Sequence, residues 1–225
     1  IVLYIQRISI MFNNPICNDI YHTSSKMYGV INSHNLNRII QTVDKAISQY
    51  GRVLAIRCDL RFANVDPDSP VVFQNNDSAV ITRFIESLKS QVSEDLFRKG
   101  LQLARVHHTD VLYAWAREQD ESLYQHYHVL ILLNYNTYAY LGDYLTDGHS
   151  LANKIQKAWC SATGLPYPDY ASLVHFPERP CYQLFKYEIQ ADPRNYIDCL
   201  CRAAYLAKER SKIRGAGYRT FGASQ

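Results

Sequence analysis

The sequence predicts an α+β fold in which a central antiparallel β-sheet carries helices packed mainly on one face. Two observations support this class. The strand-like segments do not alternate regularly with the helical ones, as they would in a protein built on a parallel sheet. In addition, the strand-like segments 110–118 and 126–134 are separated by a short polar link, which favours an antiparallel hairpin.

The composition is that of an ordinary globular protein. With 225 residues, of which 47% are hydrophobic and 20% charged, the chain can bury a substantial core. No apolar run reaches the roughly 20 residues that a membrane-spanning helix needs. The first ten residues lack the pattern of a signal peptide, and the six cysteines, none in a CxxC pair, are interpreted as free thiols. We therefore expect a cytoplasmic protein with no membrane partner.

Residues 1–50 are predicted to be an N-terminal extension, and residues 51–225 the main domain. The extension contains one amphipathic helix at about 35–50, which ends at Gly51. Residues 1–34 have no pattern that assigns them. The apolar positions of the helix follow its 3.6-residue period, at Leu36, Ile39, Ile40, Val43 and Ile47.

The main domain opens with a strand at 53–62. Successive side chains of a strand point to opposite faces, so this strand has one polar face made by Arg57, Asp59 and Arg61. Its other face is apolar and consists of Leu54, Ile56, Cys58, Leu60 and Phe62. Such a strand is half buried, with its polar side available for binding or chemistry.

The next segments are a loop at 63–77 and a long helix capped by Asp77 or Ser78. This helix has its apolar stripe at Ile81, Phe84, Ile85, Leu88 and Val92. A second helical stretch is expected from 93 to about 106. The strand at 110–118 and the link 119–125 then lead into the strand at 126–134.

The last third of the chain is predicted to contain two helices and two short strands. A helix over 151–163 ends at Gly164, and strands follow at 172–176 and 181–187. Asp192 and Pro193 stand where a helix cap and a first-turn proline belong. The final helix buries a stripe formed by Ile197, Leu200, Ala204 and Ala207.

A histidine pair at the start of the 126–134 strand is the first candidate functional feature. His126 and His128 lie on the same face, with Tyr127 on the other, so the two imidazoles can share one metal ion. Taken alone, such a pair is more often two half-exposed strand residues. In an antiparallel hairpin Glu118 lies opposite His126, which makes it a candidate third ligand, although alone such a carboxylate is more often a solvated strand end. Asp59 is a further candidate. Carboxylate ligands indicate Mg²⁺ or Mn²⁺.

A tyrosine and a lysine on the final helix are the second candidate feature. Tyr205 and Lys208 are three residues apart and are therefore neighbours on the helix surface. With 18 tyrosines in the chain, simple packing is the ordinary role of any one of them. However, a phenol flanked by a lysine and followed by a basic tail is what attack on a phosphodiester needs, with a metal ion to polarise the phosphate oxygens.

Together, these motifs resemble those of a known group of enzymes. His126-Tyr127-His128 and Tyr205-Leu206-Ala207-Lys208 resemble motifs two and three of the HUH endonucleases, which initiate rolling-circle replication. The segments Trp115-Ala-Arg-Glu118, Leu173-Val-His-Phe-Pro177 and Ala204-Tyr-Leu-Ala-Lys208 are similar to the replication proteins of inoviruses, which are filamentous phages, and to prophage proteins of the YagK/YfjJ type. The resemblance covers about residues 51–225. Ala55-Ile-Arg-Cys-Asp-Leu-Arg61 stands where motif one is normally a hydrophobic strand with threonine, which leaves the ligand role of Asp59 open.

The resemblance implies a site-specific DNA nickase that acts in the cytoplasm of a bacterial host cell. Tyr205 would attack a phosphodiester, leaving a 5′-phosphotyrosine intermediate and a free 3′-OH that primes replication, and Lys208 would assist. The implied partners are single-stranded or origin DNA, with the host replication helicase and polymerase as further candidates. Phosphate contacts are expected from a set of basic residues, namely Arg57, Arg61, Arg202, Arg210, Lys212 and Arg214.

Several alternatives stay open. The protein could be a non-cutting, decayed or regulatory prophage DNA-binding protein, an HUH transposase or relaxase, or an α+β interaction protein. A second tyrosine one turn from Tyr205 would occupy a position held by Cys201 or Glu209, so a single nucleophile is favoured, with Tyr218 and Tyr196 in reserve. His175 is interpreted as a phosphate contact or a contact behind the metal ligands. The sequence does not indicate the oligomeric state.

Overall fold

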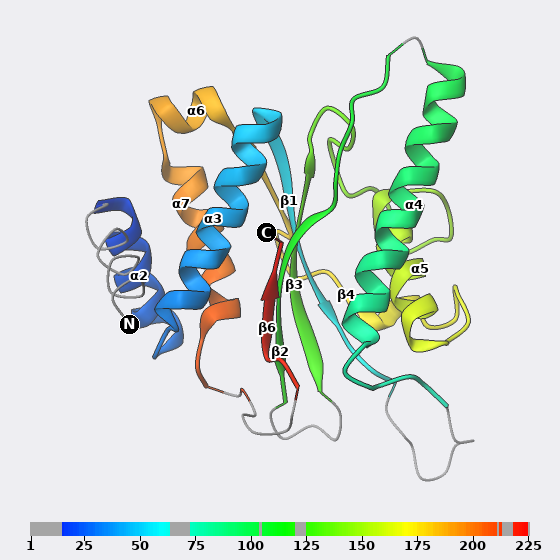
Figure 1. The fold of residues 1–225 in the computed structure, drawn as a ribbon, viewed down its shortest axis with the longest axis horizontal. Helices are drawn as coiled ribbons and strands as arrows, with labels where there is room; N and C mark the ends of the chain where they lie inside the picture. Colours follow the sequence, from blue (N-terminus) through cyan, green and yellow to red (C-terminus); the bar gives the residue numbers. More distant parts are fainter. Residues whose placement is uncertain are drawn as a thin grey trace.

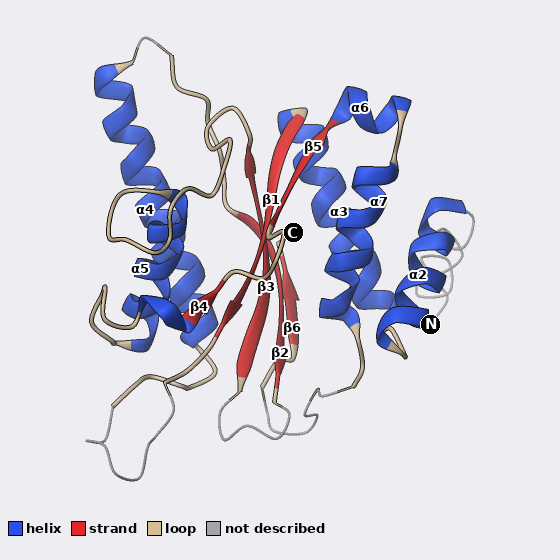
Figure 2. Ribbon diagram, turned by 180° about the vertical axis from the view of Figure 1, so that it is seen from behind, coloured by secondary structure: helices blue, strands red, loops and turns tan. Residues whose placement is uncertain are grey.

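A six-stranded antiparallel sheet lies at the centre of the computed structural model, which describes residues 15–63, 73–103, 105–119, 125–210, 212 and 218–224. The α+β class with a central antiparallel sheet is confirmed. The helices, however, cover both faces of the sheet rather than mainly one (Figures 1 and 2). A three-layer arrangement of helices, sheet and helices results.

The strands run in the order β4-β1-β3-β2-β6, and β5 lies beside β4 along the same edge of β1. All paired strands are antiparallel. Their bounds are β1 (Arg52–Leu60), β2 (Leu112–Glu118), β3 (His126–Asn134), β4 (Val174–His175), β5 (Cys181–Phe185) and β6 (Phe221–Ala223). The three central strands lie where the sequence predicts them, and β2 and β3 form the expected hairpin. The two short strands are shorter than predicted, since a 3₁₀ turn over Ala171–Leu173 precedes β4 and α6 begins at Lys186, directly after β5.

One face of the sheet packs against α4 (Val80–Gln102) and α5 (Leu151–Thr163), with the 3₁₀ turn η1 (Ala171–Leu173) beside α5. The predicted apolar face of β1 lies in this first core. Its centre is a cluster of rings in which Trp159 packs edge-on against Phe62, and the Trp159 indole N–H donates to the Arg61 carbonyl at 2.6 Å. The two helical stretches expected between 78 and 106 are one helix, since no glycine or proline interrupts it before Gly100.

The opposite face packs against α2 (Pro15–Tyr28), α3 (Ser33–Tyr50), α7 (Arg194–Ala203) and the 3₁₀ turn η2 (Ala204–Ala207). The short helix α6 (Lys186–Ala191) connects β5 to α7. The predicted helix at 35–50 is α3, which ends at Gly51 with φ +70°. Residues 15–50 therefore complete the second core, and the segment expected as an extension packs directly on the sheet.

The sequence analysis left α2 unassigned because its apolar pattern is weak. Only two of its residues are buried, Ile20 and Ser24, and one of these is polar. None of the helices in the described part of the chain combines the length and the apolar character that crossing a bilayer would require.

Gly222 in β6 provides a test of how the last strand is held. A Cβ atom at this position would come within 2.6 Å of the Trp115 indole ring, which is itself buried. We expect Gly222→Ala to lower the free energy of unfolding by about 1–3 kcal/mol, as overpacking typically does. Urea denaturation followed by tryptophan fluorescence measures this change.

The same substitution at Gly100 is the matched control. Gly100 lies near the end of α4 with no atom within 4 Å of the added methyl group. Gly100→Ala should leave stability unchanged or raise it by up to about 1 kcal/mol through helix propensity. Equal urea midpoints for the two variants would contradict the packing described for β6.

Candidate active site

The histidine pair begins β3, and the alternation of the strand places its members as predicted. Tyr127 points into the first core and is 1% exposed, whereas His126 and His128 point to the opposite face. The two Nε2 atoms are 3.1 Å apart. His128 is buried and His126 is half-buried, so the pair lies at the border between the protein interior and solvent.

Glu118 completes a set of three metal-ligating side chains. In the β2–β3 hairpin it stands opposite His126, as the sequence predicts. Its Oε2 atom is 3.4 Å from His128 Nε2, and one ligand atom from each of the three residues lies within 4.8 Å of the others. Two imidazole nitrogens and one carboxylate oxygen form a donor set that could hold a divalent metal ion.

Asp59 reaches the site from β1, on the other side of β3. The β1–β3 register places it opposite His128, and His128 Nδ1 lies 2.5 Å from Asp59 Oδ1. Since a carboxylate only accepts, Nδ1 carries a proton, and Nε2 is the ring atom that faces Glu118 and His126. Asp59 therefore has the position of a group that orients a metal-binding histidine. His175 lies behind it, with Nδ1 3.4 Å from Asp59 Oδ2.

Neighbouring groups of opposite charge shift the pKa values of the ionisable side chains in this cluster. Burial alone would raise the pKa of Asp59, but the hydrogen bond and charge of His128, together with Arg57, lower it to about 2. The same competition lowers the pKa of Glu118, where His128 and Lys208 outweigh burial. Burial would lower the pKa of His128, but the two carboxylates raise it above its ordinary value. A proton on His128 would therefore compete with a metal ion.

Tyr205 and Lys208 lie beside the three ligands. Lys208 Nζ donates to Tyr205 Oη at 2.5 Å and to Glu118 Oε2 at 2.9 Å, so it connects the phenol to the ligand set. The rings of Tyr205 and His128 meet edge to face, with centroids 4.8 Å apart. The Arg57 guanidinium stacks on the Tyr205 ring at 4.6 Å. Burial would lower the pKa of Lys208, but its contacts with Tyr205 and Glu118 raise it, so the side chain stays charged.

The local backbone explains how close Tyr205 and Lys208 are. The sequence analysis expected both on a continuing α-helix, but α7 ends at Ala203 and Tyr205 lies in η2. Side chains at i and i+3 eclipse one another in a 3₁₀ turn. Lys208, which follows η2 directly, is therefore aligned with Tyr205, and its backbone N–H donates to the Tyr205 carbonyl.

The other predicted DNA-contacting residues lie apart from this cluster. Arg61 is exposed at the end of β1, and Arg202 donates to the Glu178 carbonyl at 2.6 Å. Lys212 donates to the Leu206 carbonyl, and Arg210 is exposed. Arg214 lies outside the described residues. Of the six, Arg57 alone takes part in the described contacts of Tyr205.

Sequence analysis missed one aromatic neighbour of the site. Tyr28, at the end of α2, packs edge-on against Tyr205 with ring centroids 5.3 Å apart. No local pattern identifies it, since its proximity depends on the packing of α2 against α7 and η2. The reserve nucleophile Tyr196 points elsewhere and donates to Asp44 at 2.6 Å. Tyr218 packs under the Arg117 guanidinium.

The part of the chain that matches known proteins spans the same residues as the fold described above. The model of the family described as YagK/YfjJ C-terminal domain matches residues 15–224, from the first residue of α2. The uncharacterized protein YagK of Escherichia coli (strain K12) is 37% identical over 180 residues, 79% of this chain and 86% of YagK. The uncharacterized protein YfjJ of the same strain is 32% identical over 195 residues, 84% of this chain and 92% of YfjJ. No solved structure shows a significant match.

Mn²⁺ titration tests the ligand set. We expect His128→Ala and Glu118→Gln each to lower Mn²⁺ affinity more than about 100-fold, since losing a group that only orients a ligand already costs about 10–100-fold. Isothermal titration calorimetry measures the affinity. His108→Ala is the control, because His108 is exposed and pairs with Asp110 away from the site. Equal affinities for the wild type and His128→Ala would rule out this site.

Proposed function

The chain belongs to the YagK/YfjJ family, and from the geometry of its site we propose that it is a metal-dependent single-strand DNA endonuclease and strand transferase. It would start rolling-circle replication of a phage or prophage element in the cytoplasm of a bacterial host. Its partners would be single-stranded or origin DNA, together with the host replication helicase and polymerase. This proposal joins the HUH-type motifs to the geometry of the site.

The observation that carries the proposal is the double contact of Lys208. This ammonium group donates both to Tyr205 Oη and to Glu118 Oε2. Lys208 thus connects the Tyr205 phenol directly to Glu118, one of the three candidate metal ligands. A tyrosine packed only for stability needs no buried lysine at its hydroxyl, and burying that lysine carries a desolvation cost.

The proposed reaction is a transesterification. Tyr205 Oη forms a bond to the phosphorus atom of one phosphodiester, and the bond from phosphorus to the 3′ oxygen breaks. The phenol proton goes to solvent, and the leaving 3′ oxygen takes up a proton to become a free 3′-OH. The 5′ phosphate stays on Tyr205, so the reverse attack by a 3′-OH rejoins a strand without ATP.

The residues of the site have distinct roles in this scheme. Lys208 stabilises the negative charge that develops on the attacking phenol oxygen. Arg57 holds the Tyr205 ring by stacking, and its charge favours a phosphate nearby. Asp59 keeps His128 in the tautomer that can bind a metal. A divalent ion held by His126, His128 and Glu118 would supply polarisation of the phosphate oxygens.

The first test is covalent adduct formation. The purified protein is incubated with single-stranded oligonucleotides tiling the neighbouring DNA in the presence of Mn²⁺ and run on denaturing gels. We expect a shifted protein band that disappears with EDTA and is absent in Tyr205→Phe. Tyr196→Phe is the control, because its phenol donates to Asp44 of α3 and has no described contact with the cluster, and it should form the adduct normally.

Two other outcomes have definite meanings. An adduct that persists in Tyr205→Phe would make another phenol the nucleophile, with Tyr28 the first to test because its ring lies against Tyr205. If no oligonucleotide gives an adduct while DNA binding is measurable, the protein is a non-cutting DNA-binding protein.

A second test separates the role of Lys208 from that of the metal ligands. We expect Lys208→Ala to slow single-turnover adduct formation by roughly 10²–10³-fold, as the loss of one preorganised donor does in other enzymes. Its Mn²⁺ affinity should be unchanged or higher, since a positive charge next to Glu118 is removed. Loss of Mn²⁺ binding together with activity would instead indicate a structural role for Lys208.

A further inference from the structure

A groove of about 640 Å³ runs along β6, outside the cluster described above. Its floor is β6, the last strand on this side of the sheet that the structure describes. One wall comes from the first turns of α3. The residues on which the argument rests are Asn32, Arg38, Tyr218, Arg219 and Phe221.

The residues that line the groove are neighbours of the candidate active site in the sheet and along the chain. Phe221 in β6 pairs with Ala116, and Ala116 and Glu118 lie on the same face of β2, two residues and therefore about 7 Å apart. At the same end, Asn32 donates to the side chain of Glu209, which follows Lys208 in the chain. One end of the groove is thus adjacent to Glu118 in the sheet and to Lys208 along the chain, although neither residue lines it.

The described lining combines positive charge with exposed aromatic surface. Arg38, Lys212 and Arg219 contribute cations, while Glu209 is the acidic residue among the described lining residues. Tyr218 is 48% exposed, and the Arg117 guanidinium lies 4.7 Å from its ring centroid. Cations that follow a phosphate backbone and aromatic rings on which bases stack are what proteins use to bind single strands.

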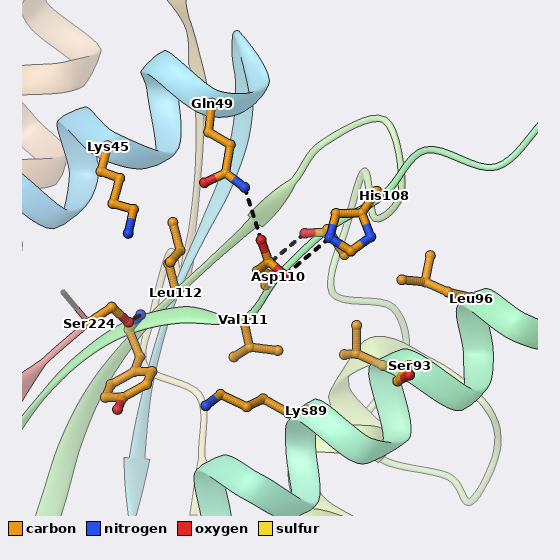
Figure 3. Close-up of a pocket in the computed structure, with 13 residues that line it drawn as sticks. Lys45, Gln49, Lys89, Ser93, Leu96, His108, Asp110, Val111, Leu112 and Ser224 are labelled. Carbon is orange, nitrogen blue, oxygen red and sulfur yellow. Dashed lines mark hydrogen bonds and ion pairs between the residues drawn. The ribbon is translucent and has the colours of Figure 1, made fainter.

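A second open cavity also carries cations but, unlike the groove along β6, lies far from the candidate active site. It has a volume of about 680 Å³ and lies between α3 and α4 beside residues 108–113, where Lys45 and Lys89 reach in from the two helices (Figure 3). Asp110 in this cavity accepts from Gln49 and lies against His108. Leu112 is six residues from Glu118 along β2, roughly 20 Å away, so this cavity opens at the far end of the strand.

We propose that the groove along β6 binds the single-stranded DNA that flanks the scissile phosphate. This inference rests on the proposed function and deepens it by assigning the path of the substrate strand. Arg219 and Arg38 contact phosphates, and Tyr218 stacks on a base. Base stacking and phosphate contacts are tolerant of sequence, so the groove orients the strand rather than selecting the nicking sequence.

Fluorescence anisotropy with a labelled single-stranded oligonucleotide in EDTA tests the groove, since binding is then measured without cleavage. Tyr218→Ala should weaken binding about 5- to 150-fold, the range expected for one lost stacking contact. Arg219→Ala should reduce the dependence of log affinity on log salt by about 0.7, the value for one lost phosphate contact to a single strand. Both residues are exposed, so the fold should survive, and thermal unfolding checks this.

Lys45→Ala is the matched control, because it removes one exposed cation from the other cavity on the same helix α3 as Arg38. Its affinity and salt dependence should equal those of the wild type. The proposal is overturned if Tyr218→Ala and Arg219→Ala bind as the wild type does, or if Lys45→Ala shows the same losses as Arg219→Ala.

The binding assay of the groove variants and the adduct assay of the proposed function can fail independently of each other. If Tyr205→Phe abolishes the adduct while the groove variants bind normally, the nickase stands and the groove proposal fails. If no adduct forms on any oligonucleotide but Tyr218 and Arg219 are required for binding, the groove is a single-strand site and the nickase proposal fails.

Discussion

The buried imidazole of His128, held between a carboxylate from each neighbouring strand, is the interaction on which the rest of the site depends. Asp59 of β1 contacts Nδ1, and Glu118 of β2 lies close to Nε2. This arrangement requires the registers of β1, β3 and β2 to be correct together, since a slip by one residue would turn His128 into the opposite core. Apolar cores on both faces of the sheet hold those registers.

Burial strengthens the electrostatic contacts within the cluster, but it also raises the cost of leaving any of its charges unpaired. Glu118, His128 and Lys208 are all buried, and each ionised group would be costly there without a partner. They are arranged as alternating charges, with Lys208 next to Glu118 and His128 between Glu118 and Asp59. The helices on this face exclude water from the inner side of the cluster, while His126 and Tyr205 stay half-exposed. The open side of the cluster is therefore the one on which His126 and Tyr205 lie.

Local sequence patterns predicted the parts of the site that lie within one hairpin. The two-residue alternation assigned the faces of His126, Tyr127 and His128, and the short link between strands brought Glu118 opposite His126. The position of Asp59 required the register between β1 and β3, which are about 70 residues apart in sequence and have no turn to align them. Helices on both faces were also missed, although the nearly unbroken apolar run Val129–Leu133 is typical of a strand buried on both sides.

The 3₁₀ turn η2 shows why the N-terminal helices matter to the site. A continuing α-helix would place Tyr205 next to Cys201, which is buried against the second core. The chain instead tightens after Ala203. The connection between α2 and α3 holds this turn, since Asn32 N–H donates to the Ala207 carbonyl and Glu209 N–H donates to the Val30 carbonyl. The connection between α2 and α3 thus holds the backbone on both sides of Lys208, and it lies within the residues that the family model matches.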